Sequence, residues 1–81
     1  MIPAQCRAAR GLLNITQSAL ADAAAVGLTT VVDFEKERRQ VGRFSVSFIR
    51  RALEAAGVVF IEENGGGPGV RLRKVGSDGG T

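Results

Sequence analysis

Apolar residues near the start of the chain recur with the spacing of one face of a helix. They predict a first helix over residues 3–12, and Pro3 suits its first turn because the N–H that proline lacks would have no intrahelical partner there. Cys6 lies on this apolar stripe, so we expect a buried and unreactive thiol. The stripe consists of Ile2, Cys6, Ala9 and Leu13.

Two further helices are predicted on either side of Gly27. Thr16 is a suitable N-cap for a helix over residues 17–25. After a short turn around Gly27, the next helix should begin at Thr29 or Thr30 and continue to about residue 36. The inner side of the earlier helix is formed by Leu20, Ala21 and Ala24. In the later helix Val31, Phe34 and Glu35 share one face, and Thr29, Thr30, Val32, Asp33 and Lys36 lie mostly on the other.

The pattern changes after a predicted loop over residues 37–42. A fourth helix follows the loop, and Gly57 is well placed to end it in a left-handed conformation. Its apolar positions are Val46, Ile49, Ala52, Leu53 and Ala56. Alternating residues then predict two strands, over residues 58–62 and 70–74, around a glycine-rich turn that contains Pro68. Residues 1–75 are expected to form one domain, and residues 76–81 a disordered tail.

The predicted hairpin has one apolar side, formed by Val58, Phe60, Val70 and Leu72. An isolated two-stranded ribbon is only marginally stable in water, so this side should pack against another surface. Either the ribbon and the fourth helix form a two-fold interface between two chains, or the ribbon covers the core of a monomer.

Composition removes several classes of function. The chain has 81 residues with 44% hydrophobic and 23% charged residues, which is typical of a small globular domain. No segment has the length and apolar character of a membrane span or signal peptide, so a cytoplasmic location is predicted. A single cysteine and the lack of histidine leave no common metal site or nucleophile–base pair. We therefore expect no enzymatic activity, no metal and no cofactor.

The net charge of +3 becomes informative through its position in the chain. Basic residues cluster from the end of the third predicted helix onward, where they form either a solvated surface or a site for phosphate groups. The cluster comprises Lys36, Arg38, Arg39, Arg43, Arg50 and Arg51, against Glu35 and Glu37.

Two short helices joined by a tight turn are typical of a helix-turn-helix. The segments "RAARGLLNITQSALADAAAVGLTTVVDFEKERR" and "IRRALEAAGVVFIEENGGGPGVRL" resemble the small Xre/Cro-type helix-turn-helix transcriptional regulators of bacteria and phages. The resemblance implies a mainly α fold, a four- to five-helix bundle of the lambda-repressor-like type, here followed by the hairpin. It also implies binding to double-stranded DNA as a homodimer at an inverted repeat, as a repressor or activator that often regulates its own gene. RNA polymerase or another regulator is a further candidate partner.

The resemblance also implies roles for individual residues. Gln17 matches a glutamine that lies against the DNA backbone and often reaches a base, and Glu35 matches an acid that ties the recognition helix to its neighbours. The positions that enter the major groove are Leu28, Thr29, Thr30, Val32 and Asp33. Those that hold backbone phosphates are Arg38, Arg39 and Arg43, with Lys36 beside them.

The third predicted helix departs from this family in one important respect. Before Lys36 it has no arginine, lysine, asparagine or glutamine, the residues that form paired hydrogen bonds with guanine or adenine. One interpretation is that apolar and hydroxyl groups read the bases while Asp33 accepts from cytosine. The alternative is that the fold has become a protein-binding antagonist of another transcription factor, with Leu28 and Val32 on its docking surface.

Overall fold

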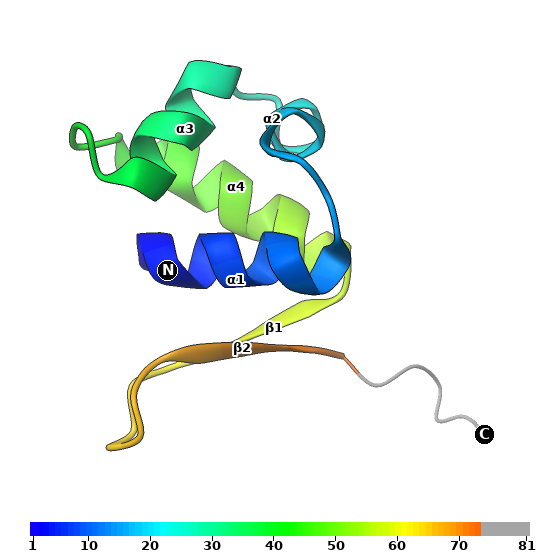
Figure 1. Cartoon of the computed structure of the whole chain (residues 1–81), viewed down its shortest axis with the longest axis vertical. Coiled ribbons are helices and arrows are strands. Elements are labelled where there is room, and N and C mark those ends of the chain that lie inside the picture. Colours follow the sequence, from blue (N-terminus) through cyan, green and yellow to red (C-terminus); the bar gives the residue numbers. More distant parts are fainter. Residues whose placement is uncertain (74–81) are drawn as a thin grey trace.

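The computed structural model describes residues 1–73, which form a mainly helical domain with a small antiparallel hairpin (Figure 1). The elements are α1 (Pro3–Leu13), α2 (Gln17–Ala24), α3 (Leu28–Lys36), α4 (Arg43–Ala55), β1 (Val58–Ile61) and β2 (Gly69–Leu72). All six predicted elements are present, although α3 begins one residue before the predicted start and each strand ends earlier than expected. The predicted tail and Lys74 lie outside the described residues. Within residues 1–73 no helix combines the length and apolar character needed to span a membrane.

The helix ends follow local backbone chemistry. Thr16 caps α2, since its hydroxyl accepts a hydrogen bond of 3.0 Å from the backbone N–H of Ala19. The chain leaves α2 and α3 through residues with left-handed backbones, Ala25 at φ 57° and Glu37 at φ 56°. Gly57, predicted to have this conformation after α4, has φ 109°. Left-handed residues at the ends of α2 and α3 turn the chain sharply and place the next segment back against the bundle.

The core lies between the four helices. α2 contributes Leu20, Ala21 and Ala24, as predicted, and its small residues let α3 and α4 pack closely against it. Of the predicted apolar positions in α4, Ile49 and Leu53 are fully buried. The other apolar residues with little exposed surface are Cys6, Ala9, Val31, Val41, Val58 and Phe60.

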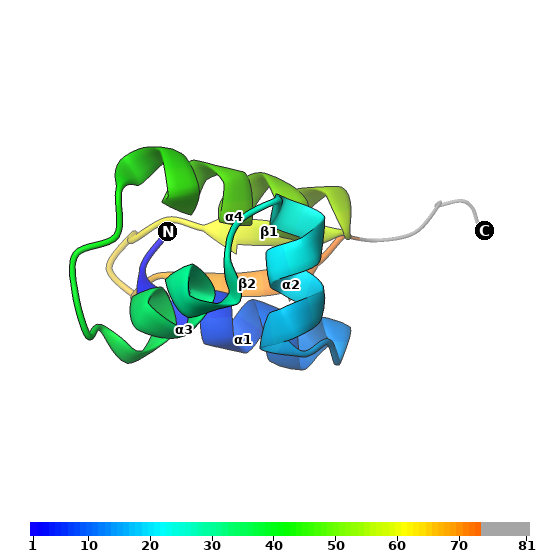
Figure 2. The same ribbon diagram turned by 90° about the horizontal axis from the view of Figure 1, so that it is seen from above.

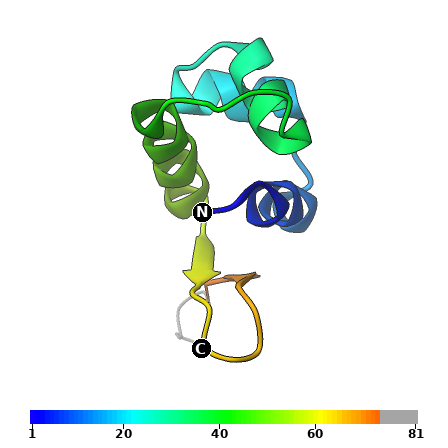
Figure 3. The ribbon, with the colours of Figure 1, turned by 90° about the vertical axis from the view of Figure 1, so that its left-hand side faces the viewer.

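The hairpin lies at the end of the molecule away from α2 and α3 (Figure 3). β1 packs against α4 and β2 against α1, which agrees with the prediction that one side of the ribbon covers the bundle. Leu72, predicted on this side, is however 46% exposed, because it lies at the end of the ribbon. In the strand register Val58 lies opposite Leu72 and Phe60 opposite Val70. The Nε2 of Gln5 attaches α1 to the turn end of the hairpin by donating to the backbone oxygens of Ile61 at 3.3 Å and Gly69 at 3.0 Å.

Candidate functional site

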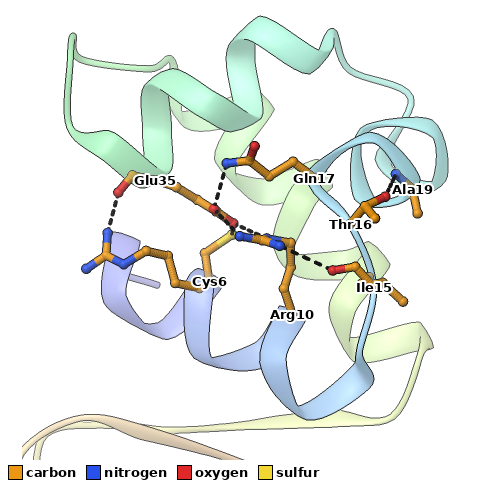
Figure 4. A network of polar contacts seen from close by, with 8 residues as sticks. Cys6, Arg10, Ile15, Thr16, Gln17, Ala19 and Glu35 are labelled. Atoms are coloured by element: carbon orange, nitrogen blue, oxygen red, sulfur yellow. Dashed lines mark hydrogen bonds and ion pairs between the residues drawn. The ribbon is translucent and has the colours of Figure 1, made fainter.

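A buried carboxylate on α3 is the centre of the polar contacts in the bundle (Figure 4). Glu35 is only 2% exposed. Arg10 of α1 reaches it with two parallel hydrogen bonds, Nε to Oε2 and Nη2 to Oε1, each 2.7 Å long. Such a planar two-point contact fixes both distance and orientation. The ion pair therefore sets the position of α3 relative to α1.

Two further side chains form hydrogen bonds with the same carboxylate. The amide Nε2 of Gln17, the first residue of α2, donates to Oε1 at 3.0 Å, and the Sγ of Cys6 donates to Oε2 at 3.2 Å. Arg7 donates from Nη1 to the backbone oxygen of Glu35. Three helices thus meet at Glu35, which confirms the expectation that this acid has a structural role.

The charges in this network shift the ionisation of its members. Burial alone would raise the pKa of Glu35, but the hydrogen bonds from Arg10, Gln17 and Cys6 outweigh it and hold that pKa below its ordinary value. The hydrogen bond to Glu35 raises the pKa of Arg10. Burial, and then the neighbouring carboxylate, raise the pKa of the Cys6 thiol, so this thiol stays protonated and unreactive, as its position on the stripe predicted.

The Gln17 side chain points toward Glu35 and does not simply project toward solvent, where DNA would bind. One of its amide hydrogens is held by Glu35, and its side chain is only partly exposed. The amide can still offer its second N–H and its oxygen to a ligand. A DNA contact by Gln17 stays a prediction, with its geometry restricted by the link to α3.

The outward face of α3 carries most of the predicted base-reading residues. Thr29 and Lys36 are exposed on this face, and Leu28, the first residue of the helix and in line with Val31 and Glu35, is 47% exposed. Thr30 and Val32 are half-buried at the two margins of this face. The helix thus presents a surface of one aliphatic side chain, hydroxyl groups and methyl groups, with a single cation at its C-terminal end.

Asp33 departs from the predicted arrangement. It lies two residues from both Val31 and Glu35, on the outward side of α3, yet it is only 9% exposed. Its carboxylate is paired with Arg39, whose Nε donates to the Asp33 Oδ2 at 2.8 Å. The left-handed Glu37 turns the chain back, and the loop carries Arg39 over the carboxylate. The expectation of an outward-facing Asp33, free to accept from cytosine, is therefore wrong for this conformation.

The predicted phosphate-holding residues lie in one region around the end of α3. Lys36 ends the helix, Arg38 and Arg39 follow in the loop, and Arg43 opens α4; all four are exposed. The side chain of Arg39 keeps 52% of its surface exposed despite its ion pair. The Arg43 guanidinium lies 5.8 Å from the centre of the Phe44 ring.

No group of three His, Cys, Asp or Glu side chains that could hold a metal ion is found among residues 1–73. A shallow pocket beside the C-terminal end of α3 mixes apolar and polar groups and includes the ion-paired Arg39. Its lining consists of Pro3, Phe34, Glu37, Arg39, Gln40 and Val41.

Two features of the site, the role of Arg10 and the Asp33–Arg39 ion pair, escaped sequence reasoning. Arg10 had a signal, because it follows Cys6 by four residues and so lies on the same side of α1, facing the core. The Asp33–Arg39 pair had none, since its members are six positions apart across a helix end, a spacing that matches no helical repeat.

Comparison with models of known protein families finds no match to this chain, and no curated protein matches it either. The function has to be inferred from the residues and their arrangement.

Proposed function

We propose that this chain is a helix-turn-helix regulator that binds double-stranded DNA in a sequence-specific manner, with α3 in the major groove. The observation that carries the proposal is the exposed outward face of α3, bordered at its C-terminal end by four exposed cations, Lys36, Arg38, Arg39 and Arg43. Groove-reading and phosphate-holding groups occur side by side in this one region, which is the division of roles found at protein–DNA interfaces.

The arrangement of α2 and α3 supports this assignment. The two helices pack against each other and are joined by residues 25–27, where Ala25 has the left-handed backbone needed for a tight turn. Glu35 of α3 binds Gln17 of α2 and Arg10 of α1, so both helices are attached to α3. A helix that reads base edges must be held rigidly, because small displacements break hydrogen bonds of fixed geometry.

The chemistry of the exposed face suits thymine-rich and mixed sequences. Leu28 and the threonine methyl groups can contact thymine methyl groups, and the hydroxyl groups of Thr29 and Thr30 can donate to or accept from base edges. Sequence-dependent bending of DNA would add discrimination where no side chain reaches a base.

Arg39 compensates for the missing arginine within α3. Its Nε is bonded to Asp33, and its terminal nitrogens make no other hydrogen bond within residues 1–73. The pair neutralises a carboxylate that would repel phosphates and leaves the cation half exposed at the end of the helix. The loop thus supplies free guanidinium N–H donors beside a helix that has no arginine, and we assign Arg39 to a backbone phosphate.

Binding as a homodimer to an inverted repeat follows from the same assignment. One α3 covers only a few base pairs, and two copies related by a two-fold axis would contact half-sites about one DNA turn, roughly 34 Å, apart. The direction of regulation, repression or activation, depends on where the operator lies relative to a promoter.

The test is selection of bound sequences from a pool of random duplexes, followed by titration of the selected DNA by fluorescence anisotropy at several salt concentrations. We expect a reproducible inverted repeat, and affinity that falls steeply with salt. Arg38→Ala should weaken binding to all duplexes and lower the salt slope by about one unit. Thr29→Ala should instead change which base is preferred at one position of each half-site.

Arg71→Ala is the matched control, because Arg71 is an exposed arginine on β2, at the end of the molecule away from α3 (Figure 3). It removes the same charge and should leave both affinity and salt slope nearly unchanged. Equal losses for Arg38→Ala and Arg71→Ala would indicate a general charge effect and contradict the assigned site.

The exposure of Leu28 favours one alternative, a protein-docking role for the same face. In that case no sequence would be enriched from the pool, and Leu28→Arg would abolish capture of a protein partner without any effect on DNA.

A further inference from the structure

The outer side of α4 carries an apolar stripe that has no partner within the described residues. Phe44 is 71% exposed and Phe48 is 45% exposed, although both are large aromatic residues. They are four residues apart, and Arg51 and Ala55 continue the same line at intervals of three and four, both exposed. A single exposed apolar side chain is ordinary, whereas two phenylalanines in one line on a helix mark a contact surface.

This stripe lies on the side of α4 opposite its core contacts. Ile49 and Leu53 are fully buried against the bundle, and rotation by 100° per residue places Phe44, Phe48 and Ala55 on the other side of the helix. Neither phenylalanine therefore contributes to the core of its own chain. Figure 2 shows α4 along one edge of the molecule, with α3, α2 and α1 on its inner side.

The residues of the stripe are complementary to the same residues of a second copy whose helix runs in the opposite direction. In an antiparallel pair centred between Ile49 and Arg50, Phe44 of one copy faces Ala55 of the other, and Phe48 faces Arg51. The first contact fits a large ring against a small side chain, and the second places a guanidinium on an aromatic face. The intervals of four, three and four are those of a coiled-coil seam, in which antiparallel helices pack with such alternating layers.

The position of α4 relative to α3 matches this pairing. α4 crosses the long direction of the molecule (Figure 1), and it forms one flank, with α2 and α3 at one end and the hairpin at the other (Figure 3). A two-fold axis along that direction, beside α4, pairs the two helices antiparallel and leaves both α3 helices at the same end. An interface at the hairpin end would instead direct the two α3 helices away from each other.

We propose that a second copy of this chain covers the stripe of Phe44, Phe48, Arg51 and Ala55, through antiparallel pairing of α4 with α4 in the register that joins Phe44 to Ala55 and Phe48 to Arg51. This inference rests on the proposed DNA-binding dimer and specifies its interface. Of the two elements considered from the sequence for a two-fold contact, it selects the helix and leaves the hairpin as a cover for the core.

The test measures self-association of the full chain without DNA, by sedimentation equilibrium across micromolar concentrations. The wild type should exceed its monomer mass of 8.5 kDa and approach twice that value as concentration rises. Phe48→Arg places two like charges opposite each other at two points and should weaken the dimer at least about tenfold. The register predicts that Phe48→Arg combined with Arg51→Phe regains most of the lost affinity, because the aromatic and cationic partners merely exchange sides.

A second exchange tests the other layer independently. Ala55→Phe alone should oppose two large rings and weaken association, and adding Phe44→Ala should restore it. Leu12→Arg is the control for an exposed apolar residue elsewhere, since Leu12 is 43% exposed on α1 and should leave association unchanged. Far-ultraviolet circular dichroism checks that every variant is folded, which we expect because all four positions are exposed.

A monomeric wild type would overturn the proposal, and so would a dimer that ignores Phe48→Arg or is not rescued by either exchange. A monomer whose stripe binds a different protein would also overturn it. DNA binding is read separately: Phe48→Arg should weaken binding to an inverted repeat but not to a single half-site. If no variant or wild-type protein selects DNA while the exchanges still control association, the proposed function fails and the interface stands.

Discussion

The inward and outward faces of α3 differ in how firmly their side chains are held. On the inward face the Glu35 carboxylate accepts four hydrogen bonds from three side chains of α1 and α2, and Val31 is fully buried. On the outward face Thr29 and Lys36 are exposed, and Asp33 is held by Arg39 from the following loop. One side of α3 therefore holds the helix in the fold, and the other side is available to a ligand.

This difference separates folding from recognition. Substitutions on the inward face act on the position of the entire helix, because they remove contacts to two other elements. Substitutions on the outward face leave those contacts intact and alter only what the helix presents to a ligand. The same division recurs on α4, where Ile49 and Leu53 face the core and Phe44 and Phe48 face away from it.

The sharpest test of the inward face is Glu35→Ala. Its loss leaves the half-buried Arg10 without its carboxylate partner and Gln17 without its acceptor, and should reduce the free energy of unfolding by about 3 to 5 kcal/mol. Urea denaturation followed by circular dichroism measures the change. The control is Glu37→Ala, an exposed acid two residues later, which should change stability by less than about 0.5 kcal/mol. Similar losses for both would show that Glu35 does not anchor α3.

Acid should weaken the same anchor without any mutation. The pKa of Glu35 is lowered in the folded state, so the unfolded chain binds the proton more readily between the two pKa values. The stabilisation is therefore fully present above the ordinary glutamate pKa of about 4.3 and is lost as pH falls through the lowered value of the folded state. Thermal melting from neutral to acidic pH measures this loss. In Glu35→Gln that part of the pH dependence should vanish, and an unchanged acid limb would assign it to other carboxylates.

At the C-terminal end of α3 a single substitution should increase stability. Glu37 has a left-handed backbone at φ 56°, which is unfavourable for a residue with a side chain. Glu37→Gly should raise the free energy of unfolding by roughly 0.5 to 1 kcal/mol, after the greater flexibility of glycine in the unfolded chain is subtracted. Thermal melting compared with Glu37→Ala isolates the backbone effect, because both changes remove the same carboxylate. Equal melting temperatures would mean that the left-handed conformation carries no strain.

An exposed residue of α3 should give the smallest change in stability. Leu28→Ala removes a side chain that is 47% exposed and should alter the free energy of unfolding by less than about 0.5 kcal/mol. Under the proposed function it should nevertheless change the selected DNA sequence at thymine positions. Denaturation and sequence selection on the same variant measure both quantities. A large loss of stability would show that Leu28 belongs to the core and would remove the contrast between the two faces.

Prediction from the sequence was accurate for elements that depend on local pattern. Thr16 capped α2 as expected, because a threonine hydroxyl and the following backbone N–H groups are neighbours in the chain. The apolar alternation of Val58 and Phe60 located the inner side of the hairpin, since successive strand residues point to opposite faces. The buried sides of α1 and α2 followed in the same way from helical spacing.

Prediction failed where the surroundings of a side chain depend on a segment that is distant in the sequence. Helical spacing placed Asp33 on the outward face of α3, and it does lie there, but the spacing contains no information about a loop that folds back over it. Arg10 was overlooked for a related reason. A charged residue on an inward-facing position is unfavourable unless a partner lies opposite, and that partner comes from a helix 25 residues later in the chain.

The sequence by itself determined the number and order of the elements, the buried sides of α2 and β1, and the clustering of basic residues after α3. These properties depend on neighbours within a few positions, whose geometry is the same in any fold. Only the tertiary structure decided that Arg10 and Gln17 are the partners of Glu35, that Asp33 is paired with Arg39, and that the stripe of Phe44 and Phe48 is left outside the core. Each of these depends on which distant segments meet in space, and that is decided by the packing of the whole chain.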